Sequence, residues 1–136
     1  MTIEHGHSLF WTDLAEDLKD PEFLREYVAT SIQIATVDRI LNELDDAREA
    51  SGLSKAELAR AISANPAAVR RLFSTSDANP TLGTLARVAA ALGLRITVAP
   101  LDADDLSTIT EPLRTGLATD PLALVAAATE RQVAHA

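Results

Sequence analysis

Two helix starts follow each other closely in the middle of the chain, and their spacing constrains the fold more than any other feature. Ser54 and Glu57 form the pattern S-x-x-E, in which each side chain accepts a hydrogen bond from the other residue's backbone N–H. Asn65-Pro66 is a second start, because Asn caps a helix well and Pro loses nothing at the first helical position. The first helix must therefore be short, and only a tight turn can join it to the second.

Further start and stop signals predict helices on both sides of this pair. One helical segment starts at Asp20-Pro21, shows apolar residues every three or four positions, and ends at Gly52, which suits a left-handed C′ residue. The β-branched residues around Thr30–Val37 weaken it, so we expect either one long helix or a break near them. Another helix runs from the cap Thr81 to Gly93, and a last one begins at Asp120-Pro121. Two short helices with a tight turn and a third amphipathic helix form the helix-turn-helix layout, so the predicted fold class is all-α.

Residues 94–99, with the sequence LRITVA, alternate apolar and polar side chains and predict one short strand. Its backbone needs a partner, which could be residues 107–110, the same strand of a second protomer, or the sheet edge of another protein. We favour a homodimer, because helix-turn-helix proteins read two half-sites about 34 Å apart. The predicted dimerisation residues are Leu94, Ile96 and Val98.

Charge divides the chain into three parts, although its net charge is −8. Residues 1–50 carry twelve acidic and four basic side chains. Residues 51–99 carry two acidic and six basic side chains, and residues 100–136 carry six acidic and two basic ones. A basic centre between acidic ends predicts different partners for different segments. We expect an N-terminal tail over residues 1–10 that leads into an acidic helical arm to residue 50, a helix-turn-helix domain over 51–99, and a C-terminal extension with a helix over 100–136.

The stretch GLSKAELARAISANPAAVRRLFSTSDANPTLGTLARVAAALGLRI resembles the Xre, or lambda-repressor-like, helix-turn-helix family. Its final part, NPTLGTLARVAAALGLRI, and the preceding acidic arm, LKDPEFLREYVATSIQIATVDRILNELDDARE, are similar to HigA-like addiction-module antitoxins. The likeness covers roughly residues 18–99. It implies a bundle of lambda-repressor type that binds double-stranded DNA at its own promoter and neutralises a small basic ribonuclease toxin of the RelE/HigB type.

The resemblance also implies which positions contact DNA. Lys55 follows the capping serine and would touch a phosphate. The first turn of the recognition helix often carries Gln and Ser or Thr, but here it holds Pro66, which has no donor, and Ala67, which offers only a methyl group to thymine. Direct readout then falls on Asn65, Arg70 and Arg71, or is weak. The alternative role of Asn65 is a helix cap, and the alternative for the two arginines is phosphate contact or solvation. The predicted DNA-binding residues are Lys55, Asn65, Ala67, Ala68, Arg70 and Arg71.

The acidic residues of the arm have two interpretations. A solvated helix face is the commoner explanation of a charge run. Alternatively, the arm covers the basic RNA-binding surface of a toxin, since opposite charges speed association and the covered surface is closed to substrate. The predicted toxin-binding residues are Asp38, Glu43, Asp45 and Asp46.

We expect no enzyme activity, no metal site and no cofactor. The chain has no Cys, no central His and no Gly-rich phosphate loop. The adjacent carboxylates of Asp45-Asp46 and Asp104-Asp105 point apart on a helix, so neither pair forms an acid–base couple. The pair His5 and His7 lacks further ligands for a metal.

No apolar run approaches the roughly 20 residues of a membrane span, and the N-terminus shows neither a basic nor an apolar signal region. We therefore expect a cytoplasmic protein without membrane contact. Three functions fit these observations. The first is a DNA-binding antitoxin that represses its own operon, the second is a stand-alone repressor without a toxin, and the third is a protein-only adaptor with a degenerate helix-turn-helix.

Overall fold

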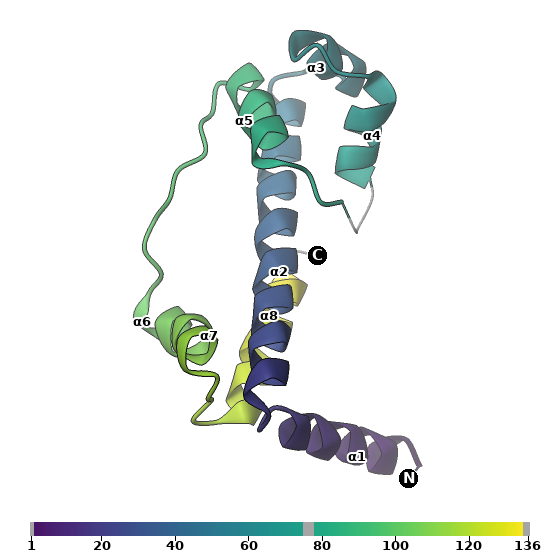
Figure 1. The fold of residues 1–136 in the computed structure, drawn as a ribbon. Helices are drawn as coiled ribbons and strands as arrows, with labels where there is room; N and C mark the ends of the chain where they lie inside the picture. Colours follow the sequence, from purple (N-terminus) through teal and green to yellow (C-terminus); the bar gives the residue numbers. More distant parts are fainter. Residues whose placement is uncertain (1, 75–77, 135–136) are drawn as a thin grey trace. The chain divides into compact units, whose positions relative to one another are not determined.

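The computed structural model describes residues 2–74 and 78–134, and the side chains of residues 10–74 and 78–131 (Figure 1). The helices are α1 (Thr2–Asp17), α2 (Pro21–Ala50), α3 (Lys55–Ala61), α4 (Pro66–Ser74), α5 (Leu82–Ala91), α6 (Ala103–Asp105), α7 (Glu111–Thr115) and α8 (Pro121–Ala134). A π-helical segment, η1 (Leu106–Thr110), joins α6 to α7. The described residues form helices and loops without any strand, which confirms the all-α fold class.

These elements pack into two compact units. The arm unit combines the residues before Thr36 with Pro100–Ala134, and the helix-turn-helix unit is formed by Thr36–Ala99. Helix α2 is continuous over 30 residues and supplies its first half to the arm unit and its second half to the other. The boundaries predicted from charge, at residues 50 and 99, stay a prediction, because packing within one chain does not show which segments fold alone.

The helix-turn-helix unit has one hydrophobic core, built where α3, α4 and α5 pack against the second half of α2 (Figure 1). Leu58 and Ala59 of α3 and Val88 of α5 are completely buried. Because Ala59 is small, α3 and α4 can approach each other closely. The core residues are Leu41, Leu44, Leu58, Ala59, Val69, Leu72, Leu85, Val88 and Ala89.

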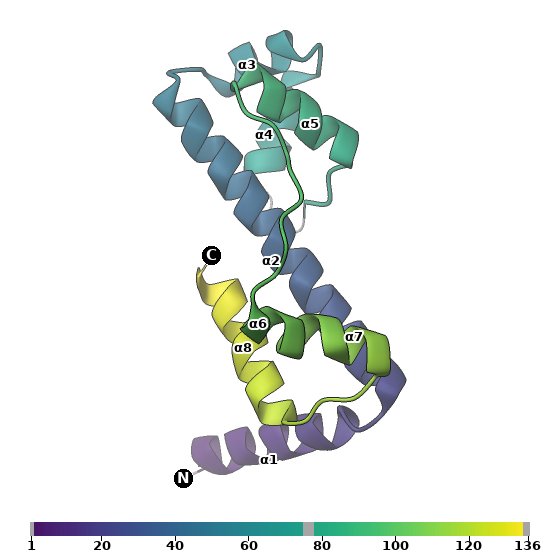
Figure 2. The same cartoon turned by 90° about the vertical axis from the view of Figure 1, so that its left-hand side faces the viewer.

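The arm unit has its own core, to which α1, the first half of α2, η1 and α8 contribute (Figure 2). Its buried residues are Leu18, Leu24, Val28, Ile109, Leu124 and Val125, and Trp11 and Leu14 of α1 pack against them. This packing explains why α1 begins at Thr2, so the prediction of a tail over residues 1–10 is wrong there. Apolar contacts of the last turns of α1 stabilise a helix that the polar sequence before residue 10 does not indicate.

Gly116 closes the arm unit at the end of α7. Its φ of +73° lies in the left-handed region, and a Cβ atom at this position would lie 2.7 Å from Cβ of Pro21. Next to it, Arg25 donates hydrogen bonds to the carbonyl oxygens of Leu113 and Arg114, at 3.1 and 3.3 Å. The first turn of α2 is thereby fixed to the C-terminal end of α7, where free carbonyls accept from a cation.

The strand predicted at residues 94–99 does not form within the chain. These residues have no ladder hydrogen bonds, and residues 107–110, one of the proposed partners, belong to η1. The apolar side chains of the segment also differ in burial, since Ile96 packs on the core while Val98 is fully exposed and Leu94 is 46% exposed. An extended segment becomes a strand only beside a partner, and the described part of this chain offers none.

Candidate nucleic-acid interface

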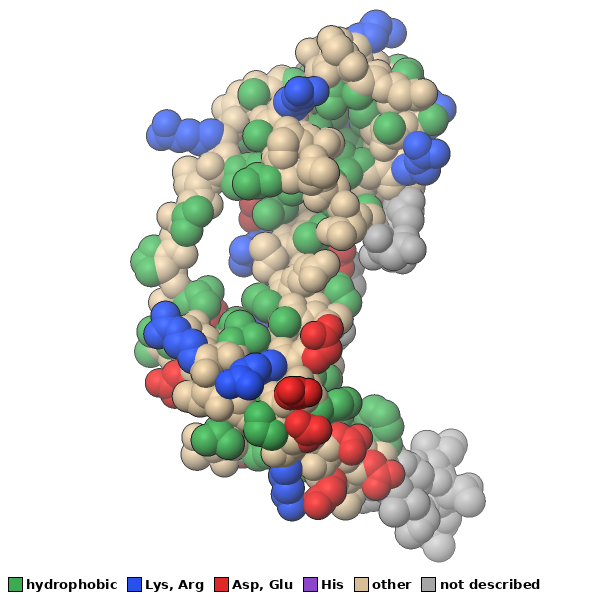
Figure 3. Space-filling model, viewed as in Figure 1, with side chains coloured by type: hydrophobic (Ala, Val, Ile, Leu, Met, Phe, Trp, Pro, Cys, Tyr) green, Lys and Arg blue, Asp and Glu red, His purple; other side chains and the backbone are tan. Residues whose placement is uncertain are grey.

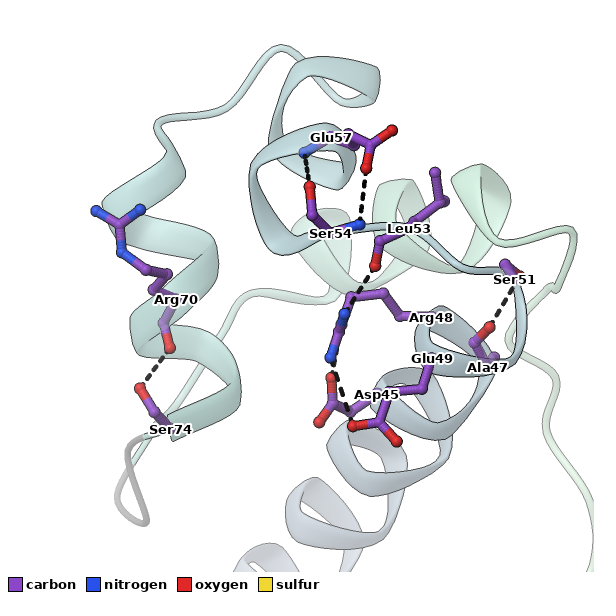
Figure 4. Close-up of polar contacts among 10 residues, drawn as sticks. All are labelled: Asp45, Ala47, Arg48, Glu49, Ser51, Leu53, Ser54, Glu57, Arg70 and Ser74. Carbon is purple, nitrogen blue, oxygen red and sulfur yellow. Dashed lines mark hydrogen bonds and ion pairs between the residues drawn. The ribbon is translucent and has the colours of Figure 1, made fainter.

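Helix α3 begins with the predicted capping box. The Ser54 hydroxyl accepts a hydrogen bond from the Glu57 backbone N–H at 3.0 Å, and the Glu57 carboxylate accepts from the Ser54 N–H at 3.1 Å (Figure 4). Two hydrogen bonds with Ser54 hold the pKa of the Glu57 carboxyl below its usual range. The bond with the Ser54 backbone has the larger effect, and the bond with its side chain the smaller one. The start of α3, and the position of Lys55 in its first turn, are thus fixed locally.

A tight turn with a left-handed residue joins α3 to α4. Ser63 has a φ of +54° although it is not glycine. The Ala64 N–H donates to the Ala59 carbonyl oxygen at 2.8 Å, and the Ser63 N–H to that of Arg60 at 3.2 Å. These two bonds form a Schellman motif, which ends α3 and turns the chain directly toward α4.

Asn65 caps the second helix of the pair. Its side-chain Oδ1 accepts a hydrogen bond from the Ala67 N–H at 2.8 Å, and its carbonyl oxygen accepts from the Ala68 N–H at 3.0 Å. This geometry agrees with the capping alternative for Asn65. At the other end of α4, the Ser74 hydroxyl donates to the Arg70 carbonyl oxygen (Figure 4).

The outer face of α4 presents the predicted contact residues together. Arg70, Arg71 and Ala68 are exposed, Ala67 is half-buried, and the opposite face of the helix is buried in the core. Among the described residues, neither arginine takes part in an ion pair. Their guanidinium groups are therefore open to a phosphate or to the edge of a guanine.

Further cations surround this helix pair in the same unit. Lys55 is half-buried at the start of α3, and three exposed arginines lie at the end of α3, on α5 and in the extended segment after it. These are Arg60, Arg87 and Arg95, which the sequence analysis left out of the DNA-binding set although it counted their charge. Figure 3 shows Lys and Arg side chains over this unit and a cluster of Asp and Glu side chains over α1 and the start of α2.

Arg48 supports the interface from α2 and was missed in the sequence. Its side chain is 13% exposed, its Nε pairs with Oδ1 of Asp45 at 2.8 Å, and its Nη1 donates to the Leu53 carbonyl oxygen at 2.7 Å (Figure 4). A third contact joins Nη2 to Oε1 of Glu49 at 3.6 Å. The only signal for this cluster in the sequence is an acidic residue three positions before an arginine in the last turns of a helix.

The four predicted toxin-binding carboxylates lie on the second half of α2, which belongs to the helix-turn-helix unit. Asp45 is bound to Arg48, Asp38 is half-buried, and Glu43 and Asp46 are exposed. Their role in binding a partner stays a prediction, and the structure gives Asp45 a contact within its own unit.

Among the described residues no group of three or more His, Asp or Glu side chains could hold a metal ion. The side chains of His5, His7 and His135 lie outside the described set. No helix in the described part of the chain is long and apolar enough to cross a membrane.

Comparison with known proteins gives one family match. Residues 44–98, from the last two turns of α2 to the extended segment after α5, match a family model described as Helix-turn-helix. This family is a DNA-binding and not an enzymatic one, so the match supports a DNA-binding regulator and confirms the helix-turn-helix resemblance. No curated protein and no solved structure matches the chain.

Proposed function

We propose that this chain is a DNA-binding antitoxin, which represses its own promoter through the helix-turn-helix unit and neutralises a small basic toxin through the arm unit. The observation that carries the proposal is the unequal charge of the two units. The segments of the arm unit, residues 1–35 and 100–136, contain thirteen acidic and four basic side chains. Residues 36–99 contain seven acidic and eight basic side chains. The arm unit thus suits a basic partner, and the other unit does not share its charge excess.

DNA binding is supported by the exposed face of α4. Its two arginines are free of ion pairs among the described residues, and the capped, tightly turned helix pair holds them on a rigid element. Rigid placement lowers the cost of ordering long side chains on the duplex. In this proposal Arg70 and Arg71 contact phosphates or guanines, and Lys55 contacts a phosphate.

The segment after α5 supports a homodimer. Its backbone has no ladder partner among the described residues, and Val98 and Leu94 are exposed beside the partly buried Ile96. In this proposal, two copies of residues 94–99 pair with each other, which satisfies their backbone groups and sets two α4 helices at the spacing of two half-sites.

The experiment that tests the proposal measures its two activities separately. The purified chain should prefer its own promoter over random duplex in a gel-shift titration at low salt. The proposal also predicts that a small basic toxin is encoded beside this chain, and that co-expression of the chain restores growth to cells arrested by that toxin. The double variant Lys55→Glu with Arg71→Glu should abolish repression, because each change puts a negative charge against phosphate, and should leave growth rescue intact.

Two outcomes would replace the proposal. If the neighbouring protein is harmless on its own, the stand-alone repressor explains the chain better. If the chain shows no preference for its promoter, the protein-only adaptor does. Pro66 and the half-buried Ala67 favour that second alternative, since neither offers a hydrogen bond to a base, and Oδ1 of Asn65 is occupied by its cap.

A further inference from the structure

The first half of α2 carries a stripe of mostly apolar residues that the arm unit covers only in part, since Tyr27 is half-buried and packs against the arm core. Its members follow one another at intervals of four, three and four, so they lie on one face of the helix. They are Phe23, Tyr27, Thr30 and Ile34. Phe23 is 40% exposed and Ile34 is 42% exposed, although the adjacent face of the same helix, with Leu24 and Val28, is fully buried. Large exposed apolar side chains gathered on one face mark an interaction surface.

A hollow of about 290 Å³ opens on this stripe. The described residues that line it are Phe23, Glu26, Tyr27, Thr30 and Ser31. Its volume lies at the lower limit of small-ligand sites, about 300 Å³. A hollow of this size accommodates one long side chain of a partner better than a cofactor.

The polar groups of the hollow suit a cation with an apolar stem. The Glu26 carboxylate lies at its edge and accepts one hydrogen bond from the Thr30 hydroxyl at 3.2 Å, which leaves it acceptor capacity. Ser31 is only 4% exposed, and its hydroxyl has no hydrogen-bond partner in the described part of the chain. A buried hydroxyl without a partner is costly, so a donor that enters the hollow would gain a free acceptor. Phe23 and Tyr27 also line the hollow, and aromatic rings are suitable contacts for such a stem and for its positive charge.

One cation of the arm unit itself also acts on this region. Arg131 interacts electrostatically with Tyr27, whose pKa is raised by burial and lowered in part by this charge. The Arg131 side chain is 16% exposed, its Nε and Nη2 are shielded from solvent, and its Nη1 lies 3.9 Å from a carboxylate oxygen of Asp105. Its ion pair among the described residues is thus with Asp105, while Nε and Nη2 have no hydrogen-bond partner there.

The charge of the unit decides which partner fits. A second copy of this chain would bring the same excess of acidic residues against the stripe, and like charges oppose such an association. We infer that the α2 stripe is the docking surface for the basic protein partner, with an Arg or Lys side chain of that partner inserted in the hollow between Phe23 and Glu26. This inference rests on the proposed antitoxin function and places the contact on α2 before Ala35, not on Asp38, Glu43, Asp45 and Asp46.

The test compares variants of the full-length chain for binding to the purified basic protein encoded beside it, by isothermal titration calorimetry. Ile34→Ser and Glu26→Lys change exposed positions on the stripe and at the hollow, and Phe23→Ser removes the aromatic anchor. Each should raise Kd by about 30-fold, the size of a hot-spot loss. Asp46→Lys tests the alternative contact on the second half of α2. Asp13→Lys is the matched control, because it reverses an exposed charge of the arm unit outside the stripe and should change Kd by less than about threefold.

Promoter binding and the thermal midpoint should be unchanged in Ile34→Ser and Glu26→Lys, which shows that these chains are folded. If the wild-type chain binds its neighbour and the stripe variants bind equally well, the inference is wrong while the antitoxin function stands. If only Asp46→Lys loses binding, the contact lies on the second half of α2. If Ile34→Ser changes the oligomeric state in light scattering and leaves partner binding unchanged, a second copy covers the stripe, which also overturns the inference. If the wild-type chain does not bind the neighbour at all, both the inference and the proposed function fail.

Discussion

Arg48 donates a hydrogen bond from Nη1 to the carbonyl oxygen of Leu53 at 2.7 Å, and this contact ties the end of α2 to the residue before α3 (Figure 4). The same guanidinium pairs with Asp45 and is mostly buried. A buried charge is stable only while its partners stay in place. This side chain therefore acts together with the backbone bonds from Gly52 to Glu49 and from Leu53 to Arg48 in fixing the direction in which α3 leaves α2.

Replacing Arg48 with Met should lower the free energy of unfolding by about 1.5–3 kcal/mol, because it removes hydrogen bonds from a charged donor and leaves the Leu53 carbonyl unpaired. Urea denaturation followed by circular dichroism measures this loss. Arg39→Met is the control, since Arg39 is an exposed arginine of the same helix, and it should change stability by less than about 0.5 kcal/mol. Equal losses in the two variants would show that the Arg48 cluster adds nothing.

The helix starts could be predicted because each is fixed by a few neighbouring residues. Ser54 with Glu57, Asn65, and Asp120, whose carboxylate accepts from the Ala123 N–H at 3.2 Å, all cap the helices that follow them. Such signals act over three or four positions and need no knowledge of the rest of the fold. For the same reason the exposed face of α4 could be derived from its spacing alone.

The elements that depend on distant partners could not be predicted in this way. Only one helix was predicted after residue 100, beginning at Asp120-Pro121. In the structure Asp102 also caps α6, and the helical segment continues to Thr115 because Ile109 is buried in the arm core. The strand predicted at residues 94–99 also depends on a distant partner. Its alternating pattern is typical of a strand, but the described part of the chain provides no second strand to pair with it. The exposure of the α2 stripe could not be predicted either, because its apolar residues have the same helical spacing as core residues.

Ser63 should gain stability when replaced by glycine. At a φ of +54° a side chain costs about 1–2 kcal/mol that glycine does not, and the greater freedom of unfolded glycine offsets part of this gain. We expect Ser63→Gly to raise the free energy of unfolding by about 0.5–1 kcal/mol in urea titrations. Ala86→Gly, at an exposed position inside α5, should lower it by a similar amount. A destabilised Ser63→Gly variant would show that this residue is not strained.

Gly116→Ala should destabilise the arm unit by more than about 2 kcal/mol, because the new Cβ would meet Pro21 at 2.7 Å and the backbone is left-handed. Fluorescence of Trp11, the single Trp of the chain, reports thermal unfolding of this unit. Gly83→Ala is the matched control, since Gly83 lies within α5 with the nearest atom 3.9 Å from its new Cβ, and it should be neutral or stabilising. A harmless Gly116→Ala would mean that the two helix ends can separate.

The capping box of α3 should make stability depend on pH. Because the folded state holds the pKa of Glu57 below its usual value, its stabilising contribution is complete above the unfolded pKa and is lost as the pH falls through the folded pKa. Glu57→Gln keeps an acceptor for the Ser54 N–H but cannot titrate. The thermal midpoint of the wild-type chain should therefore fall more steeply than that of Glu57→Gln in this acidic window, and parallel curves would exclude the effect.

Arg70→Ala and Arg71→Ala should each weaken promoter binding, and the pattern of loss identifies the contact. An arginine that reads a guanine should cost about 1–3 kcal/mol on the promoter and little on random duplex. One that binds a phosphate should weaken both DNAs alike and reduce the salt slope of log K by about 1. Fluorescence polarisation over a range of salt concentrations measures both quantities, with Arg114→Ala as the control because this exposed arginine belongs to the arm unit. If neither substitution on α4 changes binding while Arg60→Ala, Arg87→Ala or Arg95→Ala does, the duplex contacts another face of the helix-turn-helix unit, and α4 is not the recognition helix.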